Sequence, residues 1–568
     1  IIKYKDTVIN LDDSDVIEPT RKVLKDIDLE NNISDGFSLC TIDFMKKISE
    51  KLKLDYIPSG VCLRNAWFKG MLYPFPILEF IEKYNNSNYM VEDIWGNIQD
   101  IRECEMITTE SSLKLWKCYN SIEDYMTKYK DNGFDFSVTK ISPKKLDDIR
   151  EVNYQYLQSY DFDENDIKEL CQPTIDYLKK SMCGDYNSTI EFLGIDGNLN
   201  DNSWQQALFT NKYMLNDPYI IDSVHRMIKK KIDDAKIGKL RIGGNYQIAS
   251  GDPFALMQSI CGLETTGLLN ANECYSKYWN DKNEKEIVIF RSPMTSHNNI
   301  RKCQLANNDN LSYWYQYMDT IIIINGFDSF CMAENGCDYD SDILYSTNNK
   351  VLLNKHIVLP AIQCVQRNAE KIIPTEEDII LSNLNGMDNK VGSITNKVTN
   401  MKEVQSRFQK GSDEYKEMEY RMECGQLYQQ NELDKIKGIV FKPMPRKWYS
   451  IKDCETEFDK TLCANRKPYF FIYIYDYVKK EYNDYIKLNQ NKCIKTFGIK
   501  LEELLSKENK TKEEEDFIYW YNRKMPIGFG DCSMNKICNY VEQEFDKYKS
   551  SLKSNGMLIT FGFLLSLK

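Results

Sequence analysis

Three aspartates alternate along one short stretch of the chain, NGCDYDSDILYS at residues 335–346. They are Asp338, Asp340 and Asp342. Side chains two positions apart on an extended backbone point to the same side, so the three carboxylates are expected to converge. Carboxylates held that close raise one another's pKa unless a cation neutralises them. Mg²⁺, a hard ion that prefers oxygen ligands, is the cation that fits such a set.

Two other interpretations of the aspartates compete with a magnesium site. A calcium loop of the D-x-D-x-D-G type requires glycine after the third acid and glutamate at the twelfth position. Those places hold Ile343 and Asn349, so a calcium loop is excluded. An exposed acidic turn without chemistry is the other alternative, and the spacing alone does not distinguish it from a metal site.

The elements around the aspartates favour an ordered loop. The runs DTIIIING at 319–326 and ILYS at 343–346 are predicted strands, so the acidic loop is expected to be held between two ordered elements. A third apolar run, at 286–290, ends in Arg291. An acidic loop near an arginine suits a triphosphate or a ribose better than stored calcium.

The rest of the chain is predicted to alternate between strand-rich and helical regions. Residues 31–140 combine short apolar runs with turn residues, and residues 241–348 do the same. Helical spacing of apolar residues predicts helices at 143–183 and 215–237, and again after residue 360. Ser412 is a predicted N-cap in this last region, with Met418 and Met422 on one helix face.

The charge composition of the chain argues against one class of protein and leaves one basic segment to consider. A net charge of −11 and a pI near 5.2 argue against a generic nucleic-acid coat, because phosphate neutralisation needs clustered cations. One local basic cluster, at 225–241, is a candidate contact for a phosphate backbone, although a solvated helix face is the alternative. Its candidate nucleic-acid-binding residues are Lys229, Lys230, Lys231 and Arg241.

Membrane association and structural zinc are not expected. The longest apolar run, at 556–568, is shorter than the roughly 20 residues that span a bilayer. The 18 cysteines are irregularly spaced and accompany only three histidines, which argues against structural zinc. Since no signal peptide is visible, we expect reduced thiols and a cytoplasmic location.

The order of motifs resembles the catalytic module of two-barrel RNA polymerases. These double-psi β-barrel enzymes include phage single-chain RNA polymerases and the RNA-dependent RNA polymerases of eukaryotic silencing. RSPMTSHNNIR, an apolar strand and GCDYDSD match the family's R-x-P element and its D-x-D-G-D motif. Ser341 stands where the family usually has glycine. If that position needs a positive φ, serine costs about 1 kcal/mol and the loop is bent differently.

Four further segments carry the resemblance. The segment from ISDGF to KGMLYP is similar to the first barrel of the silencing polymerases and places Gly36, Arg64 and Lys69 on family positions. TTESSLKLW is similar to the segment with the second active-site lysine, here Lys114. VGSITNKVTN and GQLYQQNELDKIKG are similar to elements found after the aspartates, although Asp434 and Lys437 also suit an intrahelical ion pair.

The resemblance implies an α+β fold with two double-psi β-barrels joined by helical connectors and a helical C-terminal third. The expected domains are a lysine-bearing first barrel, a helical connector, a second barrel with the aspartates, a bridge-like helical region and a C-terminal helical domain. They span residues 1–140, 141–214, 215–350, 351–445 and 446–568.

The resemblance also implies an activity: RNA synthesis from ribonucleoside triphosphates on a nucleic-acid template by a single-chain, monomeric, Mg²⁺-dependent nucleotidyltransferase. Asp338, Asp340 and Asp342 are then the metal ligands, Lys69 and Lys114 place charge on phosphates, and Arg291 and Arg64 bind substrate, Arg291 at the ribose 2′-hydroxyl. A DNA template is favoured over an RNA template. Another Mg²⁺-dependent phosphoryl enzyme and a non-catalytic RNA-binding protein are the remaining alternatives.

Overall fold

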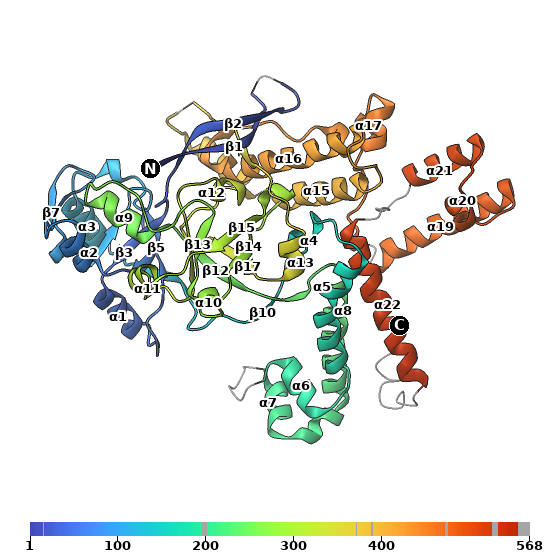
Figure 1. Ribbon diagram of the computed structural model, residues 1–568, viewed down its shortest axis with the longest axis horizontal. Helices are drawn as coiled ribbons and strands as arrows, with labels where there is room; N and C mark the ends of the chain where they lie inside the picture. The colour runs from blue at the N-terminus through green and yellow to red at the C-terminus, as the bar shows by residue number, and fades with distance from the viewer. Residues whose placement is uncertain are drawn as a thin grey trace. The chain divides into compact units, whose positions relative to one another are not determined.

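The computed structural model describes residues 1–14, 16–195, 202–370, 372–387, 390–471, 475–524 and 532–554 (Figure 1). Its contacts divide the chain into two units, each made of two separate stretches. The first unit combines Ile1–Arg150 with Gly243–Arg367, and the second combines Glu151–Ile242 with Asn368–Lys568. The five domain ranges expected from the sequence are not tested by this division and stay predictions. The apolar run at 556–568 lies outside the described residues.

A long hairpin opens the first unit. Strands β1 (Ile2–Asp12) and β2 (Thr20–Asn31) pair antiparallel. The other edge of β1 pairs in parallel with β18 (Ala361–Cys364), where Val8 lies opposite Ala361. The two stretches of this unit therefore share one three-stranded sheet.

A five-stranded sheet follows, in the region 31–140 that was predicted to be rich in strands. The strand order is β8 (Met106–Thr108), β3 (Phe37–Cys40), β5 (Phe68–Pro74), β4 (Val61–Asn65) and β9 (Ser137–Ile141). All four residues of β3 are buried, and helix α1 (Ile42–Lys51) follows it directly, capped by the Thr41 hydroxyl. Closure of this module into a first barrel stays a prediction.

The region predicted at 241–348 forms a closed six-stranded barrel. Neighbouring strands run in the order β12 (Asn245–Ser250), β16 (Ile321–Ile324), β13 (Glu273–Tyr275), β15 (Arg301–Leu305), β14 (Glu286–Phe290) and β17 (Ile343–Thr347). Four isoleucines make up β16 and all are buried, as expected for a strand inside a core. The barrel interior continues into one hydrophobic core with Phe37 and Tyr73 of the preceding sheet. A closed barrel beside the aspartates is therefore confirmed.

The second unit consists mainly of helices. Its first stretch contains α4 (Tyr154–Gln158), α5 (Glu164–Ser181), α6 (Tyr186–Leu193), α7 (Ser203–Thr210) and α8 (Pro218–Lys236). Its second stretch contains α14 (Glu376–Met387), α15 (Val391–Gln405), α16 (Asp413–Asp434), α17 (Glu457–Leu462), α19 (Asp476–Phe497), α20 (Leu501–Ser506), α21 (Lys512–Lys524) and α22 (Ser533–Ser554). Helix α22 packs along α5 and α8, and α15 packs along α16 (Figure 1).

Local signals in this unit match the sequence. The Ser412 hydroxyl caps α16, as predicted, by accepting a hydrogen bond from the Tyr415 amide. Met418 and Met422, which were predicted to share one helix face, are both buried. Among the described helices, none combines the length and the apolar character that crossing a bilayer requires. No disulfide joins the cysteines that the structure describes.

Candidate active site

The three aspartates lie in a short loop that leads into barrel strand β17. Tyr339, between the first two, is only 1% exposed and packs edge-on against the Phe37 ring. Its amide donates to the carbonyl oxygen of Asp35 at 2.9 Å. Burial of Tyr339 anchors the middle of the aspartate loop in the hydrophobic core.

The carboxylates converge as the spacing predicted. One oxygen from each of Asp338, Asp340 and Asp342 lies within 4.8 Å of the others. The Asp338 amide also donates to Oδ2 of Asp342 at 2.9 Å, which closes the loop on itself. Burial, together with the charges of Asp342 and Asp340, raises the pKa of Asp338 to about 7. The cluster concentrates negative charge that a cation would stabilise.

Two predicted cationic residues contact the cluster. Lys69, on β5 of the five-stranded sheet, forms an ion pair with Asp340. Arg291 follows β14, and its Nη2 lies 2.8 Å from Oδ2 of Asp342. Its Nη1 donates to the carbonyl oxygens of Glu334 and Asn335 at 2.9 and 3.0 Å. Arg291 thus ties the aspartate loop to the segment before it.

Lys140 is a contact that the sequence analysis missed. Its Nζ donates to the carbonyl oxygen of Ser341 at 3.0 Å, from strand β9. Strand β9 pairs with β4, where Cys62 lies opposite Lys140. The only signal in the sequence is the apolar alternation of FSVTKIS, which marks a strand. Neither the register nor the distant loop could be read from it.

Gly36, directly before strand β3, lies close against the aspartate loop. Its φ is +79°, in the region that favours glycine. A Cβ at this position would overlap the Cβ of Asp340, closer than two nonbonded carbons approach. The glycine that the resemblance placed at the start of this module is therefore required by both backbone angle and space.

Ser341 adopts a positive φ of 114°, the case considered from the sequence. A side chain at such a φ costs about 1 kcal/mol or more. Ala249 donates its amide to the Asp342 carbonyl at 2.9 Å, and Lys140 binds the Ser341 carbonyl, so the two peptide groups that follow Ser341 are fixed. The backbone around Ser341 is held by hydrogen bonds that offset this cost.

Arg64 lies on the same sheet as Lys69, and Lys114 lies in a turn outside the strands of that sheet; neither joins the cluster. Arg64 on β4 is directly opposite Lys69 on β5. The Lys114 amide donates to the Trp67 carbonyl at 2.7 Å, and both side chains are exposed. Among the described residues, neither forms an ion pair with the three aspartates. Their predicted roles in catalysis and substrate binding stay predictions.

The basic cluster at 225–241 belongs to the second unit. Lys229 and Lys230 are exposed on α8, whereas Lys231 forms an ion pair with Glu151. The guanidinium of Arg241 lies 3.8 Å from the ring centroid of Tyr177. Nucleic-acid binding by these four residues stays a prediction.

Asp434 and Lys437 form the local ion pair that was the alternative to a functional role. Lys437 Nζ lies 2.7 Å from Oδ1 of Asp434, at positions three residues apart. The pair joins the last turn of α16 to the turn that follows it. This geometry explains the two residues without chemistry.

Comparisons with known proteins give the class to which the chain is similar, phage DNA-directed RNA polymerases. The particular relative is the DNA-directed RNA polymerase YonO of Bacillus phage SPbeta, which is 28% identical over 294 residues. The match covers 50% of this chain and 32% of the phage protein, less than two thirds of the length of that relative. The chain is homologous to YonO over this stretch.

Two further comparisons address families and solved structures. No family model matches the sequence. Among solved structures, the RNA-dependent RNA polymerase QDE-1 from Thielavia terrestris aligns with a TM-score of 0.44 at 14% sequence identity. That alignment covers 72% of this chain and 45% of the other.

Proposed function

We propose that the chain is a single-chain nucleotidyltransferase that extends RNA from ribonucleoside triphosphates on a nucleic-acid template. The observation that carries the proposal is the meeting of Asp338, Asp340 and Asp342 with Lys69 at one point of the first unit. Homology to YonO, a DNA-directed RNA polymerase, supports the same activity and favours a DNA template. An RNA template is the second candidate. In this proposal the barrel is of the double-psi type and the chain acts as a monomer.

The donors fit a divalent cation. Three carboxylates supply oxygen ligands within 4.8 Å of one another, and hard cations such as Mg²⁺ take oxygen ligands. Bound there, Mg²⁺ would stabilise negative charge on the attacking and leaving oxygens of phosphoryl transfer. The raised pKa of Asp338 reflects how strongly the surroundings of the site favour neutralisation.

The chain's own residues then position the substrate. The side chain of Lys69 is 31% exposed while it contacts Asp340, so a phosphate oxygen can also reach its ammonium group. Arg291 is the proposed contact to the ribose 2′-hydroxyl, the group that separates ribonucleotides from deoxyribonucleotides. Lys140 and Gly36 act indirectly, by setting where the aspartate loop lies.

The test is replacement of Asp340 by asparagine. Asp340→Asn keeps the size of the side chain and removes one charge from the cluster, so ribonucleotide incorporation in Mg²⁺ should fall by at least about 100-fold. Asp43→Asn is the matched control, because Asp43 is an exposed acid of the same unit that pairs locally with Lys46. It should leave incorporation within about twofold of the parent.

The assay uses the full chain, four ribonucleotides, and single-stranded DNA, double-stranded DNA and RNA templates in parallel. Unchanged incorporation by Asp340→Asn would remove the proposed site. Phosphate release without templated product would indicate a different phosphoryl enzyme. Mg²⁺ binding without incorporation on any template would indicate a non-catalytic protein.

A further inference from the structure

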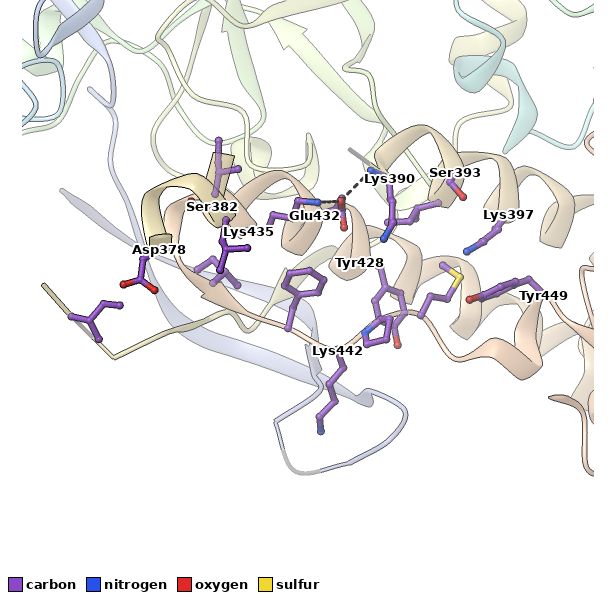
Figure 2. Close-up of a pocket in the computed structure, with 18 residues that line it drawn as sticks. Asp378, Ser382, Lys390, Ser393, Lys397, Tyr428, Glu432, Lys435, Lys442 and Tyr449 are labelled. Carbon is purple, nitrogen blue, oxygen red and sulfur yellow. Dashed lines mark hydrogen bonds and ion pairs between the residues drawn. The ribbon is translucent and has the colours of Figure 1, made fainter. Parts of the chain in front are cut away.

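A large cavity lies in the second unit. None of the residues that line it has been given a role in the candidate active site. Its volume is about 870 Å³, within the range of about 300 to 1,000 Å³ that is typical of sites for small molecules. The walls come from helices α14 and α15, the C-terminal half of α16 and the segment at 439–449 (Figure 2).

The cavity lining is positively charged. It contains four lysines, Lys390, Lys397, Lys435 and Lys442, and two acids, Asp378 and Glu432. Both acids serve the local fold. Glu432 accepts from Lys435 Nζ at 2.6 Å and from the Lys390 amide at 3.1 Å (Figure 2). Asp378 accepts from the amide and hydroxyl of Thr375 before α14. The lining therefore carries two more lysines than acids.

Lys397 is held in a place that suits an anion. Its Nζ lies 3.5 Å from the centroid of the Tyr449 ring, and burial together with the charge of Lys390 lowers its pKa. Among the described residues, no carboxylate lies within ion-pair distance of Lys397. An anionic group beside it would stabilise the charged amine that burial now disfavours.

The remaining walls offer flat and apolar surface. Phe441 and Tyr449 are partly exposed aromatic side chains in the lining, and Ile394 and Ile436 add aliphatic surface. A nucleobase of any type can stack on such rings, because every base has a flat aromatic face.

We propose that this cavity is a second nucleotide site, which takes a nucleoside 5′-triphosphate with its phosphates among Lys390, Lys397 and Lys442 and its base against Phe441 and Tyr449. The inference does not rest on the proposed polymerase activity, because every residue that forms the cavity lies in the second unit. Binding there needs no divalent ion, since side-chain ammonium groups supply the positive charge.

The experiment measures binding of radiolabelled ATP to the full chain by equilibrium dialysis in EDTA, in the Asp340→Asn background. These conditions suppress metal-dependent binding at the aspartate loop. We expect one ATP per chain, and at least about tenfold weaker binding in Lys397→Ala and in Lys442→Ala. Lys397→Arg keeps the charge and should bind within about threefold of the parent. Lys416→Ala, at an exposed lysine on α16, is the matched control and should bind within about twofold.

Further binding measurements identify which parts of the nucleotide the cavity recognises. Tripolyphosphate and adenosine should each compete more weakly than ATP, because each lacks one half of the ligand. Photo-crosslinking with 8-azido-ATP should label peptides within residues 390–449. Binding that is lost in Lys69→Ala but kept in Lys397→Ala would place the nucleotide elsewhere and overturn the proposal. A single-stranded octanucleotide that binds when ATP does not would overturn it as well, in favour of a strand-binding groove.

Discussion

At the scale of single residues, the site depends on one position where no side chain fits. Gly36 combines a φ of +79° with a contact to Asp340 that leaves no room for a methyl group. The sequence indicated this glycine only through its resemblance to a family pattern. The physical reason, a contact between residues about 300 positions apart, needed the structure.

Gly36→Ala should therefore destabilise the protein and reduce incorporation together. The backbone angle costs about 1 kcal/mol and the overlap with Asp340 adds about 1 to 3 kcal/mol. Urea unfolding measures the loss of stability, and the incorporation assay measures the displacement of Asp340. Gly133→Ala is the matched control, because Gly133 has a φ of +65° and an added methyl group there would meet no atom within 4 Å.

The control should lose only the backbone contribution and keep full incorporation. Equal losses of stability in the two variants would show that the contact with Asp340 carries no free energy. Full incorporation by Gly36→Ala would show that the aspartate loop tolerates displacement.

The residue types at the site were largely readable from the sequence. Three aspartates at alternate positions predicted converging carboxylates, and the geometry confirms it. The sequence predicted only that Lys69 and Arg291 lie near the aspartates. The structure pairs Lys69 with Asp340 and Arg291 with Asp342. Which cation meets which carboxylate depends on the sheet register and on the backbone of the loop, and neither has a local signal in the sequence.

At the scale of elements, strand β9 connects the five-stranded sheet to the aspartate loop through Lys140. Lys140 Nζ binds the carbonyl oxygen of Ser341, whose peptide group lies between two of the acids. The region 31–140 was predicted to be rich in strands, but the contact of Lys140 with Ser341 was not, because 201 positions separate the two residues. Short apolar runs predict that strands exist, and non-local pairing decides what each strand positions.

Lys140→Ala should make the aspartate loop less well positioned. Hydrogen bonds to charged donors contribute about 1.5 to 3 kcal/mol, so we expect about tenfold lower kcat/KM for ribonucleotides and a higher Mg²⁺ concentration at half-maximal rate. A titration of Mg²⁺ at saturating ribonucleotide separates this effect from a general loss of folded protein. Lys140→Arg should restore part of the rate.

Lys144→Ala serves as the control for Lys140. Lys144 follows the same strand but pairs with the exposed Asp55 at 2.6 Å. Its replacement should change neither the rate nor the Mg²⁺ dependence. If Lys140→Ala behaved in the same way, Lys140 would have no role in positioning the loop.

At the scale of the whole molecule, the two units each interrupt the other in the sequence. Residues 151–242 of the second unit lie between the two stretches of the first. Periodicity identified helical and strand-rich regions in the right order. It could not assign them to discontinuous units, because that assignment depends on pairings such as that of Val8 with Ala361.

Two units with separate cores should unfold in separable steps. Ile322→Ala in barrel strand β16 and Leu427→Ala in α16 each remove a fully buried aliphatic side chain, at a cost of about 2 to 5 kcal/mol. Differential scanning calorimetry should show each variant lowering the midpoint of a different transition. A single transition that both variants shift equally would show that the units unfold together.

The pairing of β1 with β18 has a consequence for synthesis of the protein. Strand β1 leaves the ribosome long before residues 361–364, which pair with its second edge. The barrel cannot close until β17, at residues 343–347, has been synthesised. Throughout that interval the nascent chain exposes an unpaired strand edge, the kind of surface that associates with other chains. Translation speed and chaperone supply between residues 31 and 364 should therefore govern how much of this polypeptide reaches its native form.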